Sequence, residues 1–382
     1  MARRKFFIPV LFLLAALAAL VFALKVKDEM ADFEVNYQAA QRLRLGETLY
    51  RASDGHYQFK YLPFSAFLYL PLTALPPVAA KAVWFGIVFA AIVLIFLISF
   101  KLVGKEGKSA PLLLSLTFLI MGRYFLRELQ LGQINALITL ILMLMIWSSA
   151  GHPGRRKGSM APGVLCGLAT ALKPYAAIFL PYFVLKRRWR SLAFGLGALF
   201  LAVLTPSLFY GLRGNFQVLG EWRSSLSAST PSLLDTQDNI SIIGFLLKRT
   251  SNQSLSLLIY SIVLIILAGL VLFLVAKGKS CPRPAVLEGF LLLSLIPLIS
   301  PLGWDYTMLS AAPATMLLLG NFGKFSLSGK LLLCCIWAVI ALSLYDLLGR
   351  ELYARFMSWS VITIDFLLLV GFLVFLRIKG HA

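Results

Sequence analysis

Two apolar runs decide the class of this protein: FFIPVLFLLAALAALVFAL at residues 6–24 and VWFGIVFAAIVLIFLISF at residues 83–100. Each is close to the ~20 residues that a helix needs to cross ~30 Å of hydrocarbon. Within lipid such a run must be helical, because every unpaired backbone N–H or C=O group costs several kcal/mol there. The two runs therefore predict transmembrane helices.

The composition extends this interpretation to the whole chain. Of the 382 residues, 59% are hydrophobic and 14% are charged, and the mean hydropathy is +0.85. A soluble domain has about 25% charged residues, so a soluble fold could not bury this much apolar surface. We expect an all-α polytopic membrane protein with one domain over residues 1–382, because neither a repeat nor a long linker divides the sequence.

The net charge of +20 comes from Lys and Arg residues that fall in short clusters between the apolar runs. This arrangement is typical of cytoplasmic loops and not of a nucleic-acid-binding stripe. Placing the clusters on one side of the membrane predicts about twelve spans, with both termini in the cytoplasm. The predicted spans are residues 6–24, 78–100, 110–122, 133–150, 191–209, 258–276, 285–300, 306–320, 330–347 and 358–377, with two short helices within 160–186 that meet at Lys173 and Pro174.

Residues 62–75 fit this scheme poorly. They are too few for a comfortable crossing and too apolar for water, so either a re-entrant segment or a short tilted helix is expected. On the face opposite the basic clusters the scheme leaves two long segments, residues 25–60 and about 210–257. We expect the polar chemistry on that external face.

The first external segment contains a candidate catalytic base. From Asp32 to Gly46 the apolar residues recur at helical spacing, which predicts an amphipathic helix at the outer membrane interface. A carboxylate at this boundary is well placed to take a proton from a hydroxyl group, so Asp32 is the candidate general base. Acidic residues at this place are also typical of a solvated helix start.

The stretch RYFLRELQLGQINALITL, at residues 123–140, offers candidate binding residues. Arg123 and Arg127 precede Gln133 and Asn135, which begin an apolar span. The planar fork of arginine donates two parallel hydrogen bonds and therefore suits phosphate. The alternative is that the two arginines bind no ligand, and that their side chains only extend from the lipid to place the guanidinium groups at the membrane interface.

Further candidates lie in the second half of the chain. Lys173 is flanked by apolar sequence, and a cation at membrane depth costs a few kcal/mol unless it is paired or hydrated. Asn239 lies in the second external segment, and Trp304 and Asp305 lie at a span boundary. An aromatic residue there belongs to an interfacial belt or forms a platform for a sugar ring.

The sequence shows no cluster of metal ligands, so neither a metal nor another cofactor is expected, although a loosely held divalent cation at a phosphate stays open.

Six motifs follow one another along the chain: DFEVNYQAAQRLRLGETLY, FKYLPFSAFLYLPLTALP, LGQINALITL, GLATALKPYAAIFLPYFVLKRRW, DNISIIGFL and SPLGWDYTML. In this order they resemble glycosyltransferase family 87, whose members are polyprenyl-phosphate-dependent membrane enzymes of the GT-C superfold. The resemblance implies a GT-C-like helical bundle with amphipathic helices in the first external loop, in a bacterial plasma membrane. It implies that Asp32 is the base, that Lys173 faces the donor phosphate, and that Arg123, Arg127 and Gln133 complete the same cavity.

The implied reaction is transfer of a sugar from a polyprenyl-phosphate-linked donor to an envelope glycolipid or glycan. One departure concerns Asp305 and Tyr306, which stand where many relatives have a histidine after the tryptophan, and this leaves the role of that loop open. Two other classes also stay open. A lipid-linked sugar flippase or secondary transporter would predict inverted repeats, and no corresponding halves are visible. A scaffold of an envelope-assembly complex would predict that Asp32 is dispensable.

Overall fold

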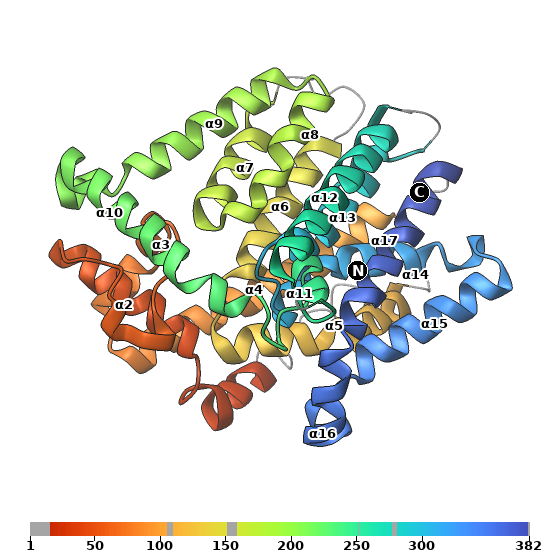
Figure 1. The fold of residues 1–382 in the computed structure, drawn as a ribbon, viewed down its shortest axis with the longest axis horizontal. Coiled ribbons are helices and arrows are strands. Elements are labelled where there is room, and N and C mark those ends of the chain that lie inside the picture. The colour runs from red at the N-terminus through yellow and green to blue at the C-terminus, as the bar shows by residue number, and fades with distance from the viewer. Residues whose placement is uncertain (1–15, 105–109, 151–158, 251, 277–280, 381–382) are drawn as a thin grey trace, which may run out of the picture.

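The computed structural model describes residues 16–104, 110–150, 159–250, 252–276 and 281–380. Within these residues every regular element is a helix and none is a strand, so the predicted all-α class is confirmed (Figure 1). The α-helices are α2 (Ala31–Leu45), α3 (Ser65–Tyr69), α4 (Pro77–Val103), α5 (Ala110–Leu131), α6 (Asn135–Ala150), α7 (Ala161–Leu172), α8 (Phe179–Leu185), α9 (Trp189–Leu204), α10 (Ser207–Ser229), α11 (Ile242–Leu247), α12 (Gln253–Ala276), α13 (Pro284–Ile299), α14 (Ala312–Gly320), α15 (Leu327–Leu342), α16 (Tyr345–Ser358) and α17 (Val361–Lys379).

Three of these helices, α4, α12 and α17, are long and apolar enough to cross a bilayer. Two pairs, α9 with α10 and α15 with α16, pass the same test together but bend by 94° and 104° at the break. By length and composition, the described residues therefore contain three to five apolar spans. The total of about twelve spans stays a prediction, and most of the first predicted span, residues 6–24, falls outside the described residues.

Most helices begin and end close to the predicted apolar runs. Helices α6 and α13 match the predicted spans 133–150 and 285–300 to within two residues. Helix α5 differs, because it continues to Leu131 and so extends well beyond the predicted end at residue 122. Its last turns bury Tyr124, Phe125 and Glu128. The Tyr124 and Phe125 rings pack against Phe366 and Phe96, and Glu128 accepts a hydrogen bond from Asn135. The 3-10 helix η6 (Asp305–Ala311) also packs against α5.

The second external segment also contains more helix than the sequence suggested. Residues 210–257 include most of α10 and all of α11. Helix α10 changes direction at Gly211, where a φ of 68° places the backbone in the left-handed region that glycine adopts easily.

The helical segment within residues 160–186 is interrupted between α7 and α8, as predicted. Lys173 is extended at the end of α7, with φ −143° and ψ 123°. Proline disfavours helical geometry in the residue before it, so the Lys173–Pro174 pair itself specifies the break. The 3-10 helix η4 (Pro174–Ile178) then leads into α8.

Residues 62–75 form only a short helix. Helix α3 and the 3-10 helix η3 (Leu70–Ala74) together run from Ser65 to Ala74. At 1.5 Å per residue this is about 15 Å, or half of the hydrocarbon thickness. The segment is therefore too short to cross a bilayer by itself.

Small residues allow α7 to pack closely against α9. A Cβ atom at Gly163 would lie 2.0 Å from the carbonyl oxygen of Ser191, and one at Gly167 would lie 2.3 Å from that of Gly195. Glycine at such crossings lets two helix backbones approach each other. This contact fixes α7, and with it the position of Lys173 at its end.

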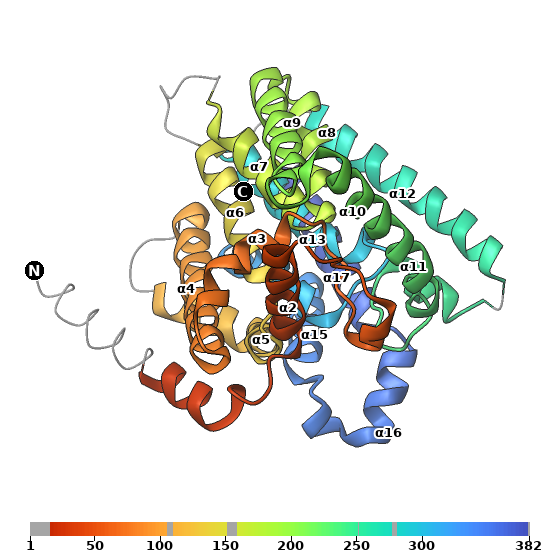
Figure 2. The same cartoon turned by 90° about the vertical axis from the view of Figure 1, so that its left-hand side faces the viewer.

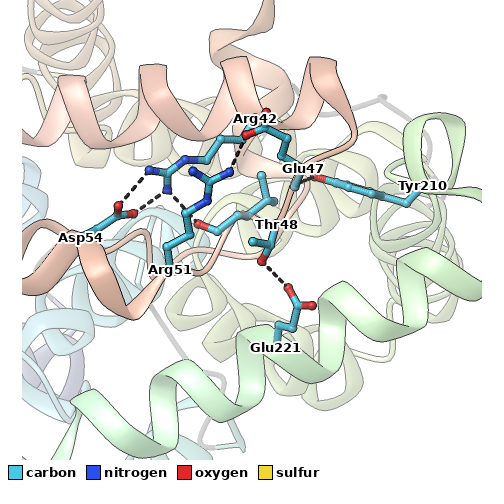
Figure 3. Close-up of polar contacts among 8 residues, drawn as sticks. Arg42, Glu47, Thr48, Arg51, Asp54, Tyr210 and Glu221 are labelled. Carbon is cyan, nitrogen blue, oxygen red and sulfur yellow. Dashed lines mark hydrogen bonds and ion pairs between the residues drawn. The ribbon is translucent and has the colours of Figure 1, made fainter.

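Polar contacts join the two long segments that the sequence places on one face. Thr48 Oγ1 donates to Glu221 Oε2 at 2.7 Å, and the Tyr210 hydroxyl donates to the carbonyl oxygen of Glu47 at 2.7 Å (Figure 3). The loop that follows α2 is thereby attached to α10.

The same loop folds back on α2. Arg42 donates to both carboxylate oxygens of Asp54 at 2.5 and 2.8 Å (Figure 3). Beneath this ion pair, Leu43 and Phe59 belong to a small apolar cluster that also includes Val218 of α10. Figure 2 shows α2 lying across the bundle, with its beginning near α5.

Candidate active site

Asp32 lies in the first turn of α2, which is attached to the end of α5. The helix begins after Met30, whose φ of 63° is left-handed, and the Met30 N–H donates to the carbonyl oxygen of Gln130 at 3.0 Å. The first turn of a helix carries the positive end of its dipole, which favours a carboxylate. The Asp32 side chain is half-buried, so it is both held in place and accessible.

Gly132 allows Gln133 to approach Asp32. Gly132 has a φ of 68°, and a Cβ atom there would lie 2.6 Å from the Cβ of Phe33. The Trp84 indole N–H donates to the Gly132 carbonyl oxygen at 2.8 Å and holds this turn against α4. Directly after the turn, Gln133 Nε2 donates to Asp32 Oδ2 at 2.8 Å.

Lys81 holds the other side of the same junction. This buried lysine pairs with Glu34 Oε1 at 2.6 Å and donates to the carbonyl oxygens of Glu29 at 2.9 Å and Lys27 at 3.2 Å. Lys81 precedes Trp84 by one turn on α4, so one end of α4 fixes both the start of α2 and the turn before Gln133.

The Gln133 amide connects the candidate base to Lys173. Its Nε2 also donates to the Tyr306 hydroxyl at 3.2 Å. Its Oε1 accepts from the Tyr61 hydroxyl at 3.3 Å and from Lys173 Nζ at 3.4 Å. Lys173 Nζ makes its shortest contact, 2.7 Å, with Asn135 Oδ1.

Asn135 links Lys173 to the buried carboxylate of Glu128. Asn135 Nδ2 donates to Glu128 Oε2 at 2.9 Å, and the backbone N–H of Ala136 donates to Glu128 Oε1 at 2.7 Å. Glu128 has an exposed fraction of 0% and Lys173 of 9%. Two charges at this depth compensate each other, because an unpaired buried ion costs several kcal/mol.

Aromatic rings surround the lysine. Lys173 Nζ lies 4.9 Å from the ring centroid of Tyr61 and 5.8 Å from that of Tyr175. Such contacts attract an ammonium group. Burial raises the pKa of Tyr61 well above its ordinary value, and Asp32 and Glu128 raise it further, so this phenol is a neutral hydrogen-bonding group. The network thus has a proton acceptor at one end and a cation at the other.

A second group of predicted residues lies beside this network and not within it. Arg123, Arg127, Trp304 and Asp305 line a cavity of about 630 Å³. Arg123 pairs with Asp305 at 3.4 Å and also donates to the backbone and hydroxyl oxygens of Ser343. The structure therefore separates Arg123 and Arg127 from Lys173, with which the resemblance had grouped them.

Asn239 lies apart from both groups, and its side chain makes hydrogen bonds to two loops. Its Nδ2 donates to the carbonyl oxygens of Leu234 and Pro301, and its Oδ1 accepts from the N–H groups of Ser241 and Gly303. With an exposed fraction of 0%, its amide makes all its hydrogen bonds within the protein. This arrangement braces the loop that carries Trp304.

The structure adds four side chains to the site that the sequence interpretation did not assign to it: Tyr61, Glu128, Tyr175 and Tyr306. Tyrosines are common at membrane interfaces, so their residue types gave no signal. The sequence does offer a signal for Glu128, because an acidic residue five positions before the predicted apolar span 133–150 needs a partner.

Among the described residues, no three or more His, Cys, Asp or Glu side chains are grouped as metal ligands would be. The expectation that the protein needs no cofactor stays a prediction.

Comparison with known proteins identifies the family. The model described as glycosyltransferase family 87 matches residues 59–301, which is more than half of the chain. The chain belongs to glycosyltransferase family 87. The match includes Gln133, Asn135 and Lys173, whereas Asp32 and the Trp304–Asp305 pair lie outside it.

Two curated relatives of this family 87 chain are similar to it. A polyprenol-phosphate-mannose-dependent alpha-(1-2)-phosphatidylinositol pentamannoside mannosyltransferase from Mycolicibacterium smegmatis is 24% identical over 377 residues, covering 94% of this chain and 86% of the relative. An alpha-(1->3)-arabinofuranosyltransferase from Corynebacterium glutamicum is 27% identical over 214 residues, covering 53% of this chain. The chain thus spans about half, 49%, of the arabinofuranosyltransferase. No solved structure matches the chain significantly.

Proposed function

We propose that this protein transfers a sugar from a polyprenyl-phosphate-linked donor to an envelope glycolipid or glycan, on the external face of a bacterial plasma membrane. The observation that carries the proposal is the hydrogen-bonded network in which Gln133 joins the Asp32 carboxylate to the Lys173 ammonium. Sugar transfer from a phosphate needs both a proton acceptor and a cation for the leaving group.

In the proposed reaction the acceptor hydroxyl oxygen attacks the anomeric carbon of the donor, and Asp32 takes the hydroxyl proton. The bond between the anomeric carbon and the phosphate oxygen breaks, and its electron pair stays on the phosphate. Negative charge therefore develops on the leaving group, where Lys173 stabilises the transition state more than the ground state. An ammonium has three donors, and Asn135 and Gln133 accept two of them, so one is left for a phosphate oxygen.

A lipid-linked donor also agrees with where the site lies. The network is built from the ends of helices in a strongly apolar chain: the start of α2, the end of α5 and the break after α7. In the proposed topology of about twelve spans, these ends meet at the external surface and α2 lies along the interface. A donor with a prenyl tail can reach such a site from the bilayer.

The names of the relatives support the same reaction class. One is described as polyprenol-phosphate-mannose-dependent, and the other is an arabinofuranosyltransferase.

The test is a transfer assay with the purified protein in lipid nanodiscs. Donors would be polyprenyl-phosphate-linked mannose and arabinofuranose, with the matching nucleotide-linked sugars as controls, and extracted envelope lipids would be the acceptors. We expect a glycosylated product and release of one polyprenyl phosphate per transfer, detected by mass spectrometry. Transfer from the nucleotide sugars alone would contradict the proposed donor. Transport of the donor without product, measured with the protein in sealed liposomes, would favour a flippase.

A further inference from the structure

The cavity lined by Arg123, Arg127, Trp304 and Asp305 lies beside the hydrogen-bonded network of Asp32, Gln133 and Lys173. It is lined by side chains of α5, the Trp304–Tyr306 loop and α16, and its volume is about 630 Å³. Ligand cavities of a few hundred to 1,000 Å³ enclose small ligands well.

The charges that line this cavity balance. Three basic residues, Lys25, Arg123 and Arg127, are matched by three acidic ones, Asp238, Asp305 and Asp346. A site for a phosphate or diphosphate would carry an excess of positive charge. The balance therefore favours a ligand without net charge.

Arg123, the residue most suited to bind an anion, is already engaged. Its guanidinium pairs with Asp305 and donates to Ser343, and its side chain is only 9% exposed. Arg127 is exposed, and it donates to Gln130 Oε1 at 2.9 Å. Arg123 is thus a paired cation, and the charges of Lys25 and Arg127 are offset by the acidic side chains that line the same cavity.

Four aromatic residues complete the lining: Trp304, Tyr306, Tyr345 and Tyr353. The rings of Tyr345 and Tyr353 meet edge to face, with centroids 5.5 Å apart. Aromatic faces give apolar contact while tyrosine hydroxyls and the indole N–H keep a polar edge. A sugar ring has the same division, with C–H faces and a rim of hydroxyl groups.

The cavity also lies next to the candidate base. Tyr306 lines it, and the Tyr306 hydroxyl is 3.2 Å from Gln133 Nε2, which is itself 2.8 Å from Asp32 Oδ2. Two side chains, Tyr306 and Gln133, therefore connect the cavity to the Asp32 carboxylate. Lys173 approaches Gln133 through Oε1, the other end of the amide.

We propose that this cavity binds neutral sugar rings of the acceptor glycan, with Trp304 and the Tyr345–Tyr353 pair as stacking surfaces. The donor phosphate occupies the Lys173 end, and the two substrates meet at Asp32. This assignment rests on the proposed transferase function, but it concerns binding and can be tested without turnover.

The experiment measures binding to an Asp32→Asn variant, in which transfer is expected to stop. Neutral di- and trisaccharides of mannose and of arabinofuranose, and inorganic phosphate, would each be titrated by calorimetry. We expect at least one neutral sugar to bind, and Trp304→Leu to weaken that binding by roughly tenfold or more, as loss of an aromatic anchor does. The matched control is Trp189→Leu, because Trp189 begins α9, does not line the cavity and is 59% exposed.

Three results would overturn the assignment: no neutral sugar binds, inorganic phosphate displaces the bound sugar, or Trp304→Leu and Trp189→Leu bind sugar equally well. Sugar binding that depends on Trp304, in a protein that transfers nothing from any donor, would leave the glycan cavity in place and would refute the proposed transferase function. The two failures can therefore be told apart.

Discussion

Replacing Lys173 by methionine removes the cation from the network and keeps most of the side-chain volume. In the proposed reaction Lys173 acts on charge that develops on the leaving phosphate. Removing one such preorganised donor lowers kcat by roughly 100- to 1,000-fold, or about 3–4 kcal/mol. We expect a loss of this size in kcat, because the charge on the leaving phosphate is larger in the transition state than in the ground state.

The same substitution leaves Glu128 without its counterion. Glu128 is fully buried, and an uncompensated buried carboxylate costs roughly 3–5 kcal/mol of stability. Loss of activity in Lys173→Met alone could then reflect unfolding. Adding Glu128→Gln removes the buried charge and keeps an amide oxygen to accept from the Ala136 N–H.

The assay compares wild type, Lys173→Met, Glu128→Gln and the double variant in nanodiscs. Thermal unfolding reports stability, and initial rates at saturating donor report kcat. We expect the double variant to regain the unfolding temperature lost by Lys173→Met while its kcat stays reduced. A double variant with the kcat of wild type would refute the role of Lys173 at the leaving group.

Three further predictions follow from the contacts around the site. Gly132→Ala places a Cβ 2.6 Å from that of Phe33 at a φ of 68°, so we expect a loss of more than about 1 kcal/mol of stability and a parallel loss of transfer; unchanged melting would contradict the geometry. Asn239→Ala removes an amide that braces two loops through four hydrogen bonds, and we expect a loss of roughly 1–3 kcal/mol in thermal unfolding, whereas an exposed Gln→Ala variant on α10 should change little. Asp305→Asn frees Arg123 and gives the cavity an excess positive charge, so calorimetry should detect tighter binding of inorganic phosphate than in wild type; no gain would contradict the charge balance.

Much of the helical architecture could be read from the sequence, because apolar runs of the right length leave little choice of structure in lipid. The interruption of the helix at Lys173 was also predictable, because the proline that follows disfavours helical geometry at Lys173. The extension of α5 to Leu131 was not predicted, because the charged residues Arg123, Arg127 and Glu128 end the apolar run without ending the helix. The number of spans depends on the side of the membrane that each loop occupies, which helix bounds do not show.

The sequence predicted many residues of the candidate site, but not which of them lie together in the structure. Asp32, Gln133, Asn135 and Lys173 were each singled out, and the structure brings them into one network. No sequence pattern separates Arg123 from them. In the structure Arg123 instead pairs with Asp305 of η6, 182 positions along the chain.

The central claim is that Asp32 is the base of a sugar transfer, and one comparison of variants tests it most directly. Asp32→Asn and Asp28→Asn make the same chemical change four residues apart, but Asp28 is exposed while Asp32 is bonded to Gln133. Initial rates with polyprenyl-phosphate sugars should be near those of wild type for Asp28→Asn and at least about 100-fold lower for a folded Asp32→Asn, as loss of a general base predicts. Equal rates for the two variants would contradict the account.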